Sequence, residues 1–316
     1  MAKALLIDGN AIGFASQMAT KLTVGGREVQ AIFGFIRTLR DVVEQFRGFE
    51  PLVLWDHRAQ WRFDLYPDYK GNRERDAKMV EMKEKYKAQK PLIGRALYTL
   101  GISQLLVRGA EADDMAGLLT AKITGRGGKV VLCTGDRDWL QLMNENVVWF
   151  DPIRGQRVTA KNFSEFTGYA TARQFLEGKA LTGDASDNIK GVGGIGEKGA
   201  PEFLMQWGSV EEFFRRADAG ELPPKLPKAW ERFARNECPP RSDVPMRDAY
   251  RRNLKLMDLQ SVPKPDPKLV KVTRGRFNPE AFRELCEELA FRSILLKFEQ
   301  WIQPFQTLTE QTRNAA

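Results

Sequence analysis

The stretch AKALLID, residues 2–8, is an apolar run that ends in a single acid, Asp8. A short apolar run bounded by polar residues is typical of a strand buried on both faces of a sheet. Similar runs occur at PLVLWD (51–56), SQLLV (103–107), KVVLCTG (129–135) and VVWF (147–150). Helical patterns lie between them, at residues 29–46 and 111–123 among others. Strands that alternate with helices predict an α/β fold with a central, mostly parallel sheet and helices on both faces.

The strand patterns stop after about residue 160. We therefore expect an α/β region over residues 1–160 and a helical region over 161–300, with helices near 246–258 and 279–298. Residues 73–90 are charged and helix-prone. The last residues, 301–316, are polar, and we expect them to form a flexible tail.

Acidic residues follow the predicted strands at the points where the strands end. Because the carboxyl ends of parallel strands meet at one edge of a sheet, we expect most of these side chains to lie close together. Two more acids come from the helical region, three residues apart, and share one face if that segment is helical. The full set is Asp8, Asp56, Glu111, Asp113, Asp114, Asp136, Asp138, Asp184 and Asp187.

Nine clustered carboxylates repel one another, and divalent cations relieve that repulsion. Oxygen ligands without histidine or cysteine suit Mg²⁺ or Mn²⁺, and two such ions about 4 Å apart serve displacement at a phosphodiester. The alternative is that the acids only stabilise helix N-termini, which would explain Glu111 or Asp136 taken singly. It explains poorly why apolar strands repeatedly bring acids to the same edge.

The composition narrows the class of protein. The 316 residues include 49 Lys and Arg against 41 Asp and Glu, a net charge of +8, which favours a polyanionic partner. His57 is the only histidine, so histidine-based zinc sites and Ser-His-Asp chemistry are disfavoured. Three widely spaced cysteines argue against a disulfide framework. Without a signal-peptide pattern at the N-terminus, we expect a cytoplasmic protein.

Basic residues follow the second strand in YPDYKGNRERD (66–76). Tyr69, Lys70 and Arg73 lie where an acid-rich metal pocket would receive a phosphate, since Lys and Arg neutralise phosphate charge and Tyr can stack on a base. The alternative is a solvated charged helix, which is the better interpretation of residues 75–90 taken individually.

The stretch KGVGGIGEKGA (190–200) matches the dinucleotide-binding pattern through Gly191, Gly193 and Gly196. A nicotinamide or flavin enzyme would place these glycines directly after the first strand of a βαβ unit. Here they follow LTGDASDNIK, which is not a strand pattern, so we disfavour a dinucleotide oxidoreductase. Glycines still let backbone amides approach a phosphate, and Lys190 and Lys198 add positive charge beside them.

Taken in order, several motifs resemble the flap endonuclease and 5′-nuclease family, which includes phage 5′-exonucleases and the 5′-nuclease domain of bacterial DNA polymerase I. The matching pieces are LLIDGN (5–10), VLWD (53–56), YPDYKGNRE (66–74), RGAEADDMAG (108–117), TGDRDWLQL (134–142) and LTGDASDNIKGVGGIGEKGA (181–200). With a helical C-terminal region they cover the chain from residue 5 to about 295.

The resemblance implies a role for each residue set. Asp8, Asp56, Glu111 and Asp113 would chiefly hold a first Mg²⁺ or Mn²⁺, and the other five acids would surround a second. Lys70 and Arg73 would be catalytic at the base of a helical arch over about 70–95, with Tyr69 near unpaired terminal nucleotides. A helix–turn–helix element over 188–200 would grip duplex DNA. Its contacts would be Lys190, Gly191, Gly193, Gly194, Gly196 and Lys198, with K⁺ held by the carbonyls of Val192 and Ile195.

The resemblance therefore implies a structure-specific 5′-nuclease that hydrolyses DNA by two-metal-ion catalysis and leaves 5′-phosphate and 3′-hydroxyl ends. Its partners would be DNA with 5′ flaps, nicks or 5′ ends, with RNA–DNA primers left open. The alternative is an inactive protein of the same fold that binds branched DNA. The chain is too short to include a polymerase domain, so we expect a monomeric, stand-alone phage or bacterial enzyme. The balance of exonuclease and endonuclease activity stays open.

Overall fold

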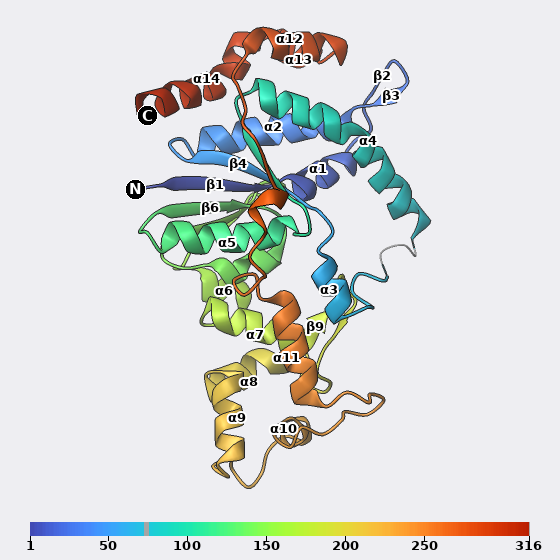
Figure 1. Cartoon of the computed structure of the whole chain (residues 1–316), viewed down its shortest axis with the longest axis vertical. Helices are drawn as coiled ribbons and strands as arrows, with labels where there is room; N and C mark the ends of the chain where they lie inside the picture. The colour runs from blue at the N-terminus through green and yellow to red at the C-terminus, as the bar shows by residue number, and fades with distance from the viewer. Residues whose placement is uncertain (73–75, 316) are drawn as a thin grey trace.

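The molecule is elongated, with a helix-covered sheet at one end and a group of helices at the other (Figure 1). The computed structural model describes residues 1–72 and 76–315, and side chains as far as residue 311. In the described part of the chain, no helix is both long enough and apolar enough to span a membrane.

The central sheet has seven strands. The five central strands are parallel, and the two edge strands pair antiparallel to their neighbours. The predicted α/β fold with a mostly parallel sheet is confirmed. In spatial order the strands are β11 (Val270–Thr273), β5 (Ser103–Val107), β4 (Glu50–Trp55), β1 (Lys3–Asp8), β6 (Lys129–Cys133), β7 (Val147–Asp151) and β8 (Gln156–Val158).

Side chains that alternate along the strands build two separate cores. Leu5 and Ile7 of β1 point to one face and Leu6 points to the other, as expected for a strand buried on both sides. The first face packs against α1 (Gly9–Gln17), α2 (Gln30–Gln45) and α4 (Ala77–Thr99). The second face packs against α5 (Ala112–Thr124) and the 3-10 helix η1 (Arg137–Leu142). A small hairpin, β2 (Thr23–Val24) and β3 (Arg27–Glu28), connects α1 to α2.

The helical end of the molecule has its own aromatic core, in which Phe203 contacts Phe213, Trp230 and Phe233. Between this end and the sheet lie α3 (Gln60–Leu65) and a two-stranded hairpin, β9 (Gly183–Asp184) and β10 (Ile189–Lys190). The helices of this end are α6 (Phe163–Thr167), α7 (Ala172–Thr182), α8 (Gly199–Trp207), α9 (Val210–Asp218), α10 (Lys228–Ala234) and α11 (Met246–Met257).

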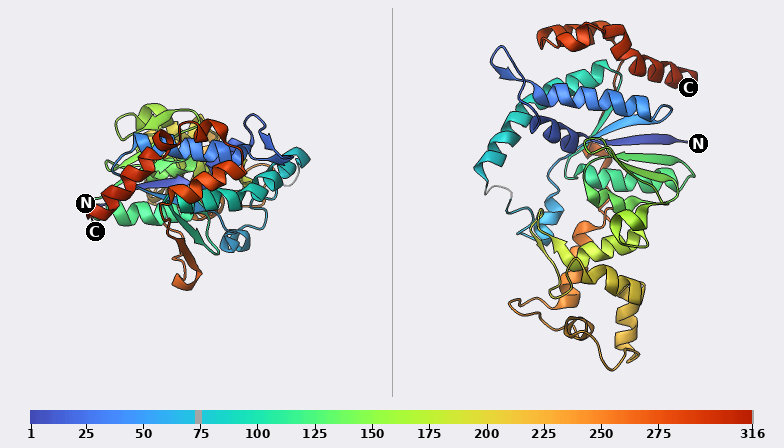
Figure 2. Two further views of the ribbon diagram at one scale, coloured as in Figure 1. Left: turned by 90° about the horizontal axis from the view of Figure 1, so that it is seen from above. Right: turned by 180° about the vertical axis from the view of Figure 1, so that it is seen from behind.

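The chain beyond α11 returns to the sheet, so residues 161–300 do not form one helical region, and that expectation is wrong. After the 3-10 helix η2 (Pro267–Leu269), β11 pairs with β5. The helix expected over 279–298 is divided into α12 (Pro279–Glu288), α13 (Arg292–Leu295) and the start of α14 (Phe298–Ala315), which lie beside α2 and α4 (Figures 1 and 2). Ala290, in the left-handed conformation, breaks the helix between α12 and α13.

The flexible tail expected over 301–316 is also wrong, because α14 is helical through residue 315. Ile302 and Phe305 are buried in the first core, and Trp301 stacks on Phe282 of α12. The segment appears polar in the sequence because only one face of this helix is apolar, and burial of that face stabilises it.

The arch expected over about 70–95 corresponds in part to α4, which continues to Thr99. Pro91 lies inside this helix without ending it. Residues 73–75, and with them the predicted catalytic residue Arg73, lie outside the described residues.

Candidate active site

The register of the sheet brings the first acids together. Ile7 of β1 is opposite Cys133 of β6, so Asp8 lies beside Thr134, whose hydroxyl donates a hydrogen bond of 2.9 Å to it. Asp56 follows β4 on the other side of β1, and its Oδ1 accepts a 2.8 Å hydrogen bond from the backbone of Ala112. This first hydrogen bond of α5 fixes the start of that helix against the sheet edge.

Two further acids complete this group. Asp113 lies in the first turn of α5 and accepts a 2.7 Å hydrogen bond from the indole of Trp139. Asp136 caps η1 by accepting from the backbone of Asp138 at 2.7 Å. We call Asp8, Asp56, Asp113 and Asp136 the inner acids. They lie at or just after the ends of β1, β4 and β6 and in the first turn of α5, as the sequence predicts.

Among the described residues, no lysine or arginine forms an ion pair with an inner acid, and the charge of Lys179 offsets the repulsion at Asp136 only in part. Burial and the Asp56 charge raise the pKa of Asp8 to about 6. Desolvation, with Asp138 and Asp8 close by, raises the pKa of Asp136 to about 7, although part of its side chain stays exposed. Desolvation and four neighbouring acids, Asp136 foremost, hold the pKa of Asp113 well above its usual range. Such crowding strongly favours a bound cation.

A second group of acids is already paired with lysines. Lys70 Nζ lies 2.5 Å from Glu111 Oε1 and 3.9 Å from Asp187 Oδ2. Lys179 Nζ bonds Asp138 and lies 2.9 Å from Asp184 Oδ2. We call Glu111, Asp138, Asp184 and Asp187 the paired acids. The lysine charge and the Ser186 hydroxyl hold the pKa of Asp184 at about 2, against the opposing effect of burial.

Asp184 and Asp187 reach this site from a turn, so the helix on which their spacing would align them does not exist. Asp184 ends β9, and its Oδ1 accepts from the backbone of Ser186 at 2.8 Å and of Asp187 at 3.3 Å. The Asp187 carbonyl accepts from the backbone of Lys70 at 2.8 Å. The turn is thereby tied to the segment that carries the predicted catalytic lysine.

Asp114 is placed differently from the other predicted ligands. Its carboxylate is 1% exposed and forms two hydrogen bonds, of 2.6 and 3.0 Å, with the guanidinium of Arg62. It also accepts from the backbone of Glu111 and so completes a capping box at the start of α5. Asp114 therefore holds Arg62 and the helix start, and both of its oxygens are engaged in these contacts.

The donor set can be tested against a divalent cation. Among the described residues, no three acidic, histidine or cysteine side chains stand in an arrangement that would hold a metal ion as placed. The inner acids nonetheless fit such an ion chemically, because they supply only oxygen donors, and burial together with neighbouring carboxylates raises the pKa of Asp8, Asp113 and Asp136.

Lys70 and Tyr69 both contact the paired acids. Lys70 has a φ of +56°, an uncommon backbone conformation that directs its amine at Glu111. The Tyr69 hydroxyl lies 3.0 Å from both Glu111 and Asp187, and its ring is 3% exposed against Phe63. Because the ring is buried, the idea that it stacks on a base is wrong for this conformation. Tyr69 instead orients two carboxylates.

The glycine turn lies between β10 and α8, so a hairpin and a loop replace the expected simple turn between two helices. Gly193 and Gly194 have φ of +90° and +79°, which only glycine adopts easily. Val192 and Ile195 are buried in the aromatic core of the helical end. Exposed positions alternate with these anchors: Lys190, Gly194, Gly196 and Lys198, while Gly191 is packed against the backbone of α7.

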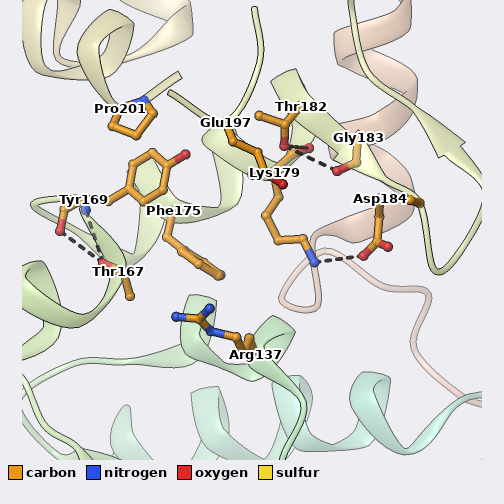
Figure 3. A pocket seen from close by; sticks show the side chains of 11 residues that line it. Arg137, Thr167, Tyr169, Phe175, Lys179, Thr182, Gly183, Asp184, Glu197 and Pro201 are labelled. Carbon is orange, nitrogen blue, oxygen red and sulfur yellow. Dashed lines mark hydrogen bonds and ion pairs between the residues drawn. The ribbon is translucent and has the colours of Figure 1, made fainter. Parts of the chain in front are cut away.

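A cavity of about 440 Å³ opens between Asp184, one of the paired acids, and Glu197 of this turn (Figure 3). Arg137, which separates Asp136 from Asp138 in the sequence, faces it with its guanidinium 4.8 Å from the ring centroid of Phe166. Lys179 reaches from α7 to Asp184 at the opposite wall. Further lining residues are Thr167, Tyr169, Phe175, Thr182, Glu197 and Pro201.

Several residues that shape the site are not among the predicted site residues. Arg62, Lys179, Asn10 and Thr134 each contact a predicted acid. Asn10 and Thr134 lie inside the motifs LLIDGN and TGDRDWLQL, whereas Arg62 and Lys179 are single polar residues in ordinary helix patterns. Lys179 could have been found, since it lies five residues before Asp184 on a helix that is otherwise apolar on that side.

Comparison with known proteins agrees with the geometry. Residues 3–168 match the family model described as the N-terminal resolvase-like domain of 5′-3′ exonucleases, and residues 170–237 match the C-terminal SAM fold of the same family. The chain belongs to the 5′-3′ exonuclease family. This confirms the family and the fold that the ordered motifs imply.

Curated relatives of the chain are bacterial polymerases. It is 37% identical over 218 residues to the thermostable DNA polymerase I of Thermus filiformis, a match that covers 68% of the chain and 25% of the relative. It is 32% identical over 313 residues to DNA polymerase I of Caldicellulosiruptor bescii, covering 93% of the chain and 33% of the relative. The chain thus spans a quarter to a third of the length of these relatives.

Solved structures share the fold. The 5′-exonuclease of phage T5 with bound zinc superposes with a TM-score of 0.67 at 24% identity, covering 82% of the chain and 90% of the neighbour. A phage T5 flap endonuclease in complex with DNA and metal ions gives 0.65 at 21% identity, covering 98% and 99%. At this level of identity the likeness concerns the fold alone.

Proposed function

We propose that the chain is a structure-specific 5′-nuclease that hydrolyses DNA phosphodiesters with divalent metal ions. The observation that carries the proposal is the group of inner acids, which parallel strands deliver to one edge of the sheet and which have no ion-paired lysine or arginine in the described part of the chain. Family membership supports the same reaction, and the metal ions and DNA recorded with the phage T5 structures support the same ligands.

The inner acids would hold a first Mg²⁺ or Mn²⁺ through Asp8, Asp56 and Asp113, with Asp136 adjoining. The paired acids would adjoin a second ion once lysine contacts yield to it. Bound there, the ions supply an activated water and neutralise charge that develops on the leaving oxygen. This assignment moves Glu111 from the first group to the second and removes Asp114 from the set of direct ligands.

The chain's own cations have a separate task. Lys70 is held at the boundary of the site by Glu111 and by its unusual backbone conformation, and a phosphate arriving there can compete for its amine. Arg137 offers a second positive group at the cavity on the opposite side. The expected role of Arg73 stays a proposal from the motif.

The glycine turn is proposed to bind the duplex backbone. Lys190, Gly194, Gly196 and Lys198 are exposed, so the lysine side chains and the glycine backbone are accessible to phosphates of a duplex. A K⁺ ion on the carbonyls of Val192 and Ile195 is part of the same proposal. Contacts of this kind position DNA without reading sequence.

Cleavage of labelled DNA tests the proposal. Flap, nicked and single-stranded substrates, labelled at the 5′ end or internally, are incubated with Mg²⁺ and with Mn²⁺. Asp136→Asn should abolish cleavage and retain DNA binding, whereas Asp41→Asn, at an exposed position of α2, should cleave as the unchanged chain does. Full activity of Asp136→Asn would refute the proposal. Tight flap binding with no cleavage in either metal would instead support the inactive branched-DNA-binding protein.

A further inference from the structure

The foot of α4 nearest the sheet is tied to an inner acid through one asparagine. Asn10, at the start of α1, donates from Nδ2 to Asp56 Oδ2 at 2.5 Å. Its Oδ1 accepts from Lys90 Nζ of α4 at 3.0 Å and lies 3.2 Å from the Tyr86 hydroxyl. The amide thus lies between a carboxylate and an ammonium group. These two charges orient it, with the amide nitrogen toward Asp56 and the amide oxygen toward Lys90.

Lys90 is held in place independently of this asparagine. Its amine lies 4.8 Å from the ring centroid of Trp55, the last residue of β4, and 5.9 Å from that of Tyr86. Its side chain is half-buried, so the ammonium is confined between two aromatic faces and one amide oxygen. Such a cation has few other positions to adopt.

The helix that carries Lys90 is fixed closely to α1. Tyr86 donates to the Gly9 carbonyl at 3.1 Å, and a Cβ at Gly13 would lie 2.5 Å from the Tyr86 ring. One turn further along, Gln89 accepts from the backbone of Ala31 at the start of α2. This part of α4 is therefore a rigid support rather than a free side of the arch.

The contrast with the other lysines of the site suggests what this contact does. Lys70 and Lys179 bond carboxylates directly and neutralise them. The Asn10 amide lies between Lys90 and Asp56. Lys90 therefore orients the carboxylate through Asn10 without occupying the place of a metal ion. Asp56 then has one donor on each oxygen, Asn10 on Oδ2 and the Ala112 backbone on Oδ1, and a lone pair on each remains available.

We propose that Asn10 and Lys90 are positioning residues that hold the Asp56 carboxylate in the orientation needed to bind a divalent cation, and that they thereby couple the foot of the arch helix to the metal site. The inference rests on the proposed function, because it assumes that Asp56 is a ligand. Groups that orient metal ligands commonly contribute tenfold or more to metal affinity or activity.

Cation binding to the DNA-free protein tests the inference. Mg²⁺ and Mn²⁺ are titrated calorimetrically into the unchanged chain, Lys90→Met, Asn10→Ala and the double variant. Each single change should weaken binding by about tenfold. The double variant should bind no more weakly than the worse single one, because both changes break one chain of contacts. Lys90→Arg keeps a donor for the amide and should restore most of the affinity.

Lys87→Met is the matched control, since Lys87 lies three residues earlier on α4, is exposed, and pairs with Glu84 at 3.6 Å as its sole ion-pair partner among the described residues. It removes the same charge and should bind cations as the unchanged chain does. Flap cleavage gives a second readout, in which Lys90→Met should need more Mg²⁺ to reach half of its maximal rate. If Lys90→Met does not fold, Asn10→Ala and Lys90→Arg still decide the question.

Two results distinguish a failure of this inference from a failure of the proposed function. If the unchanged chain binds and cleaves normally while Lys90→Met and Asn10→Ala match Lys87→Met in cation affinity, the inference is overturned and the proposed function stands. If the unchanged chain binds no divalent cation, both are overturned.

Discussion

Replacing Asp8 by asparagine should stabilise the metal-free protein at alkaline pH. Asp8 is 6% exposed beside Asp56, and its pKa is raised from 3.8 to about 6. A carboxyl whose pKa rises on folding stabilises the protein fully only below its unfolded pKa, and that contribution is lost as the pH rises through 6. Asparagine keeps an oxygen that can accept from the Ala11 backbone, as Asp8 Oδ1 does at 2.9 Å.

The magnitude follows from the two pKa values. At pH 8, ionising Asp8 in the folded chain costs about 3 kcal/mol relative to the unfolded chain, and at pH 5 it costs about half of that. The free energy of unfolding of Asp8→Asn, less that of the unchanged chain, should therefore grow by about 1.5 kcal/mol between pH 5 and pH 8. This change with pH is independent of any constant effect of the new side chain.

Urea unfolding followed by circular dichroism measures this difference in the free energy of unfolding. The measurement is made in EDTA and in excess Mg²⁺, with Asp41→Asn as a control for an exposed carboxylate. In Mg²⁺ the unchanged chain should become more stable than Asp8→Asn, because a cation bound to the inner acids stabilises only the chain that retains Asp8. A difference that stays constant from pH 5 to pH 8 in EDTA would refute the reasoning. So would an unchanged chain that becomes more stable than Asp8→Asn at pH 8 without metal.

Three further outcomes are expected. Arg62→Met should lower the free energy of unfolding, measured in urea, by about 3–5 kcal/mol, because it leaves Asp114 buried and unpaired. Adding Asp114→Leu should restore much of this lost stability. Gly117→Ala should lower the melting temperature, since its Cβ would lie 2.0 Å from the Leu259 carbonyl oxygen, whereas Gly199→Ala meets open space and should not. Binding of duplex DNA should weaken steeply and independently of sequence as salt rises, as fluorescence anisotropy can show.

The sheet and its acids could be predicted because both follow from local patterns. Apolar runs identify buried strands, and an acid at the end of each run is brought to the same edge by parallel pairing alone. Register adds the rest: once Ile7 is opposite Cys133, Asp8 must lie beside Thr134. The family motifs name the same residues, so fold and inner acids could be inferred together.

The return of the chain beyond residue 266 could not be predicted in this way. In β11 only one residue, Thr273, is even partly buried, so the strand has no apolar run that marks it in the sequence. Its formation also depends on pairing with β5, a segment more than 150 residues earlier in the chain. The same limit applies to Asp114. Its position among acids predicts a ligand, and only the tertiary contact with Arg62 reveals an ion pair.

The division of the acids into two groups has a consequence for how the site must work. Among the described residues, no lysine or arginine is ion-paired with an inner acid, so a metal ion there relieves repulsion without displacing such a partner. Lys70 lies 2.5 Å from Glu111 and Lys179 lies 2.9 Å from Asp184, so an ion at the paired acids must compete with an ammonium group. A substrate phosphate changes that competition, because it offers Lys70 a new anionic partner and leaves Glu111 with Arg62, at 3.3 Å, and Tyr69. Loading of the second group should therefore depend on bound DNA, whereas loading of the first should not.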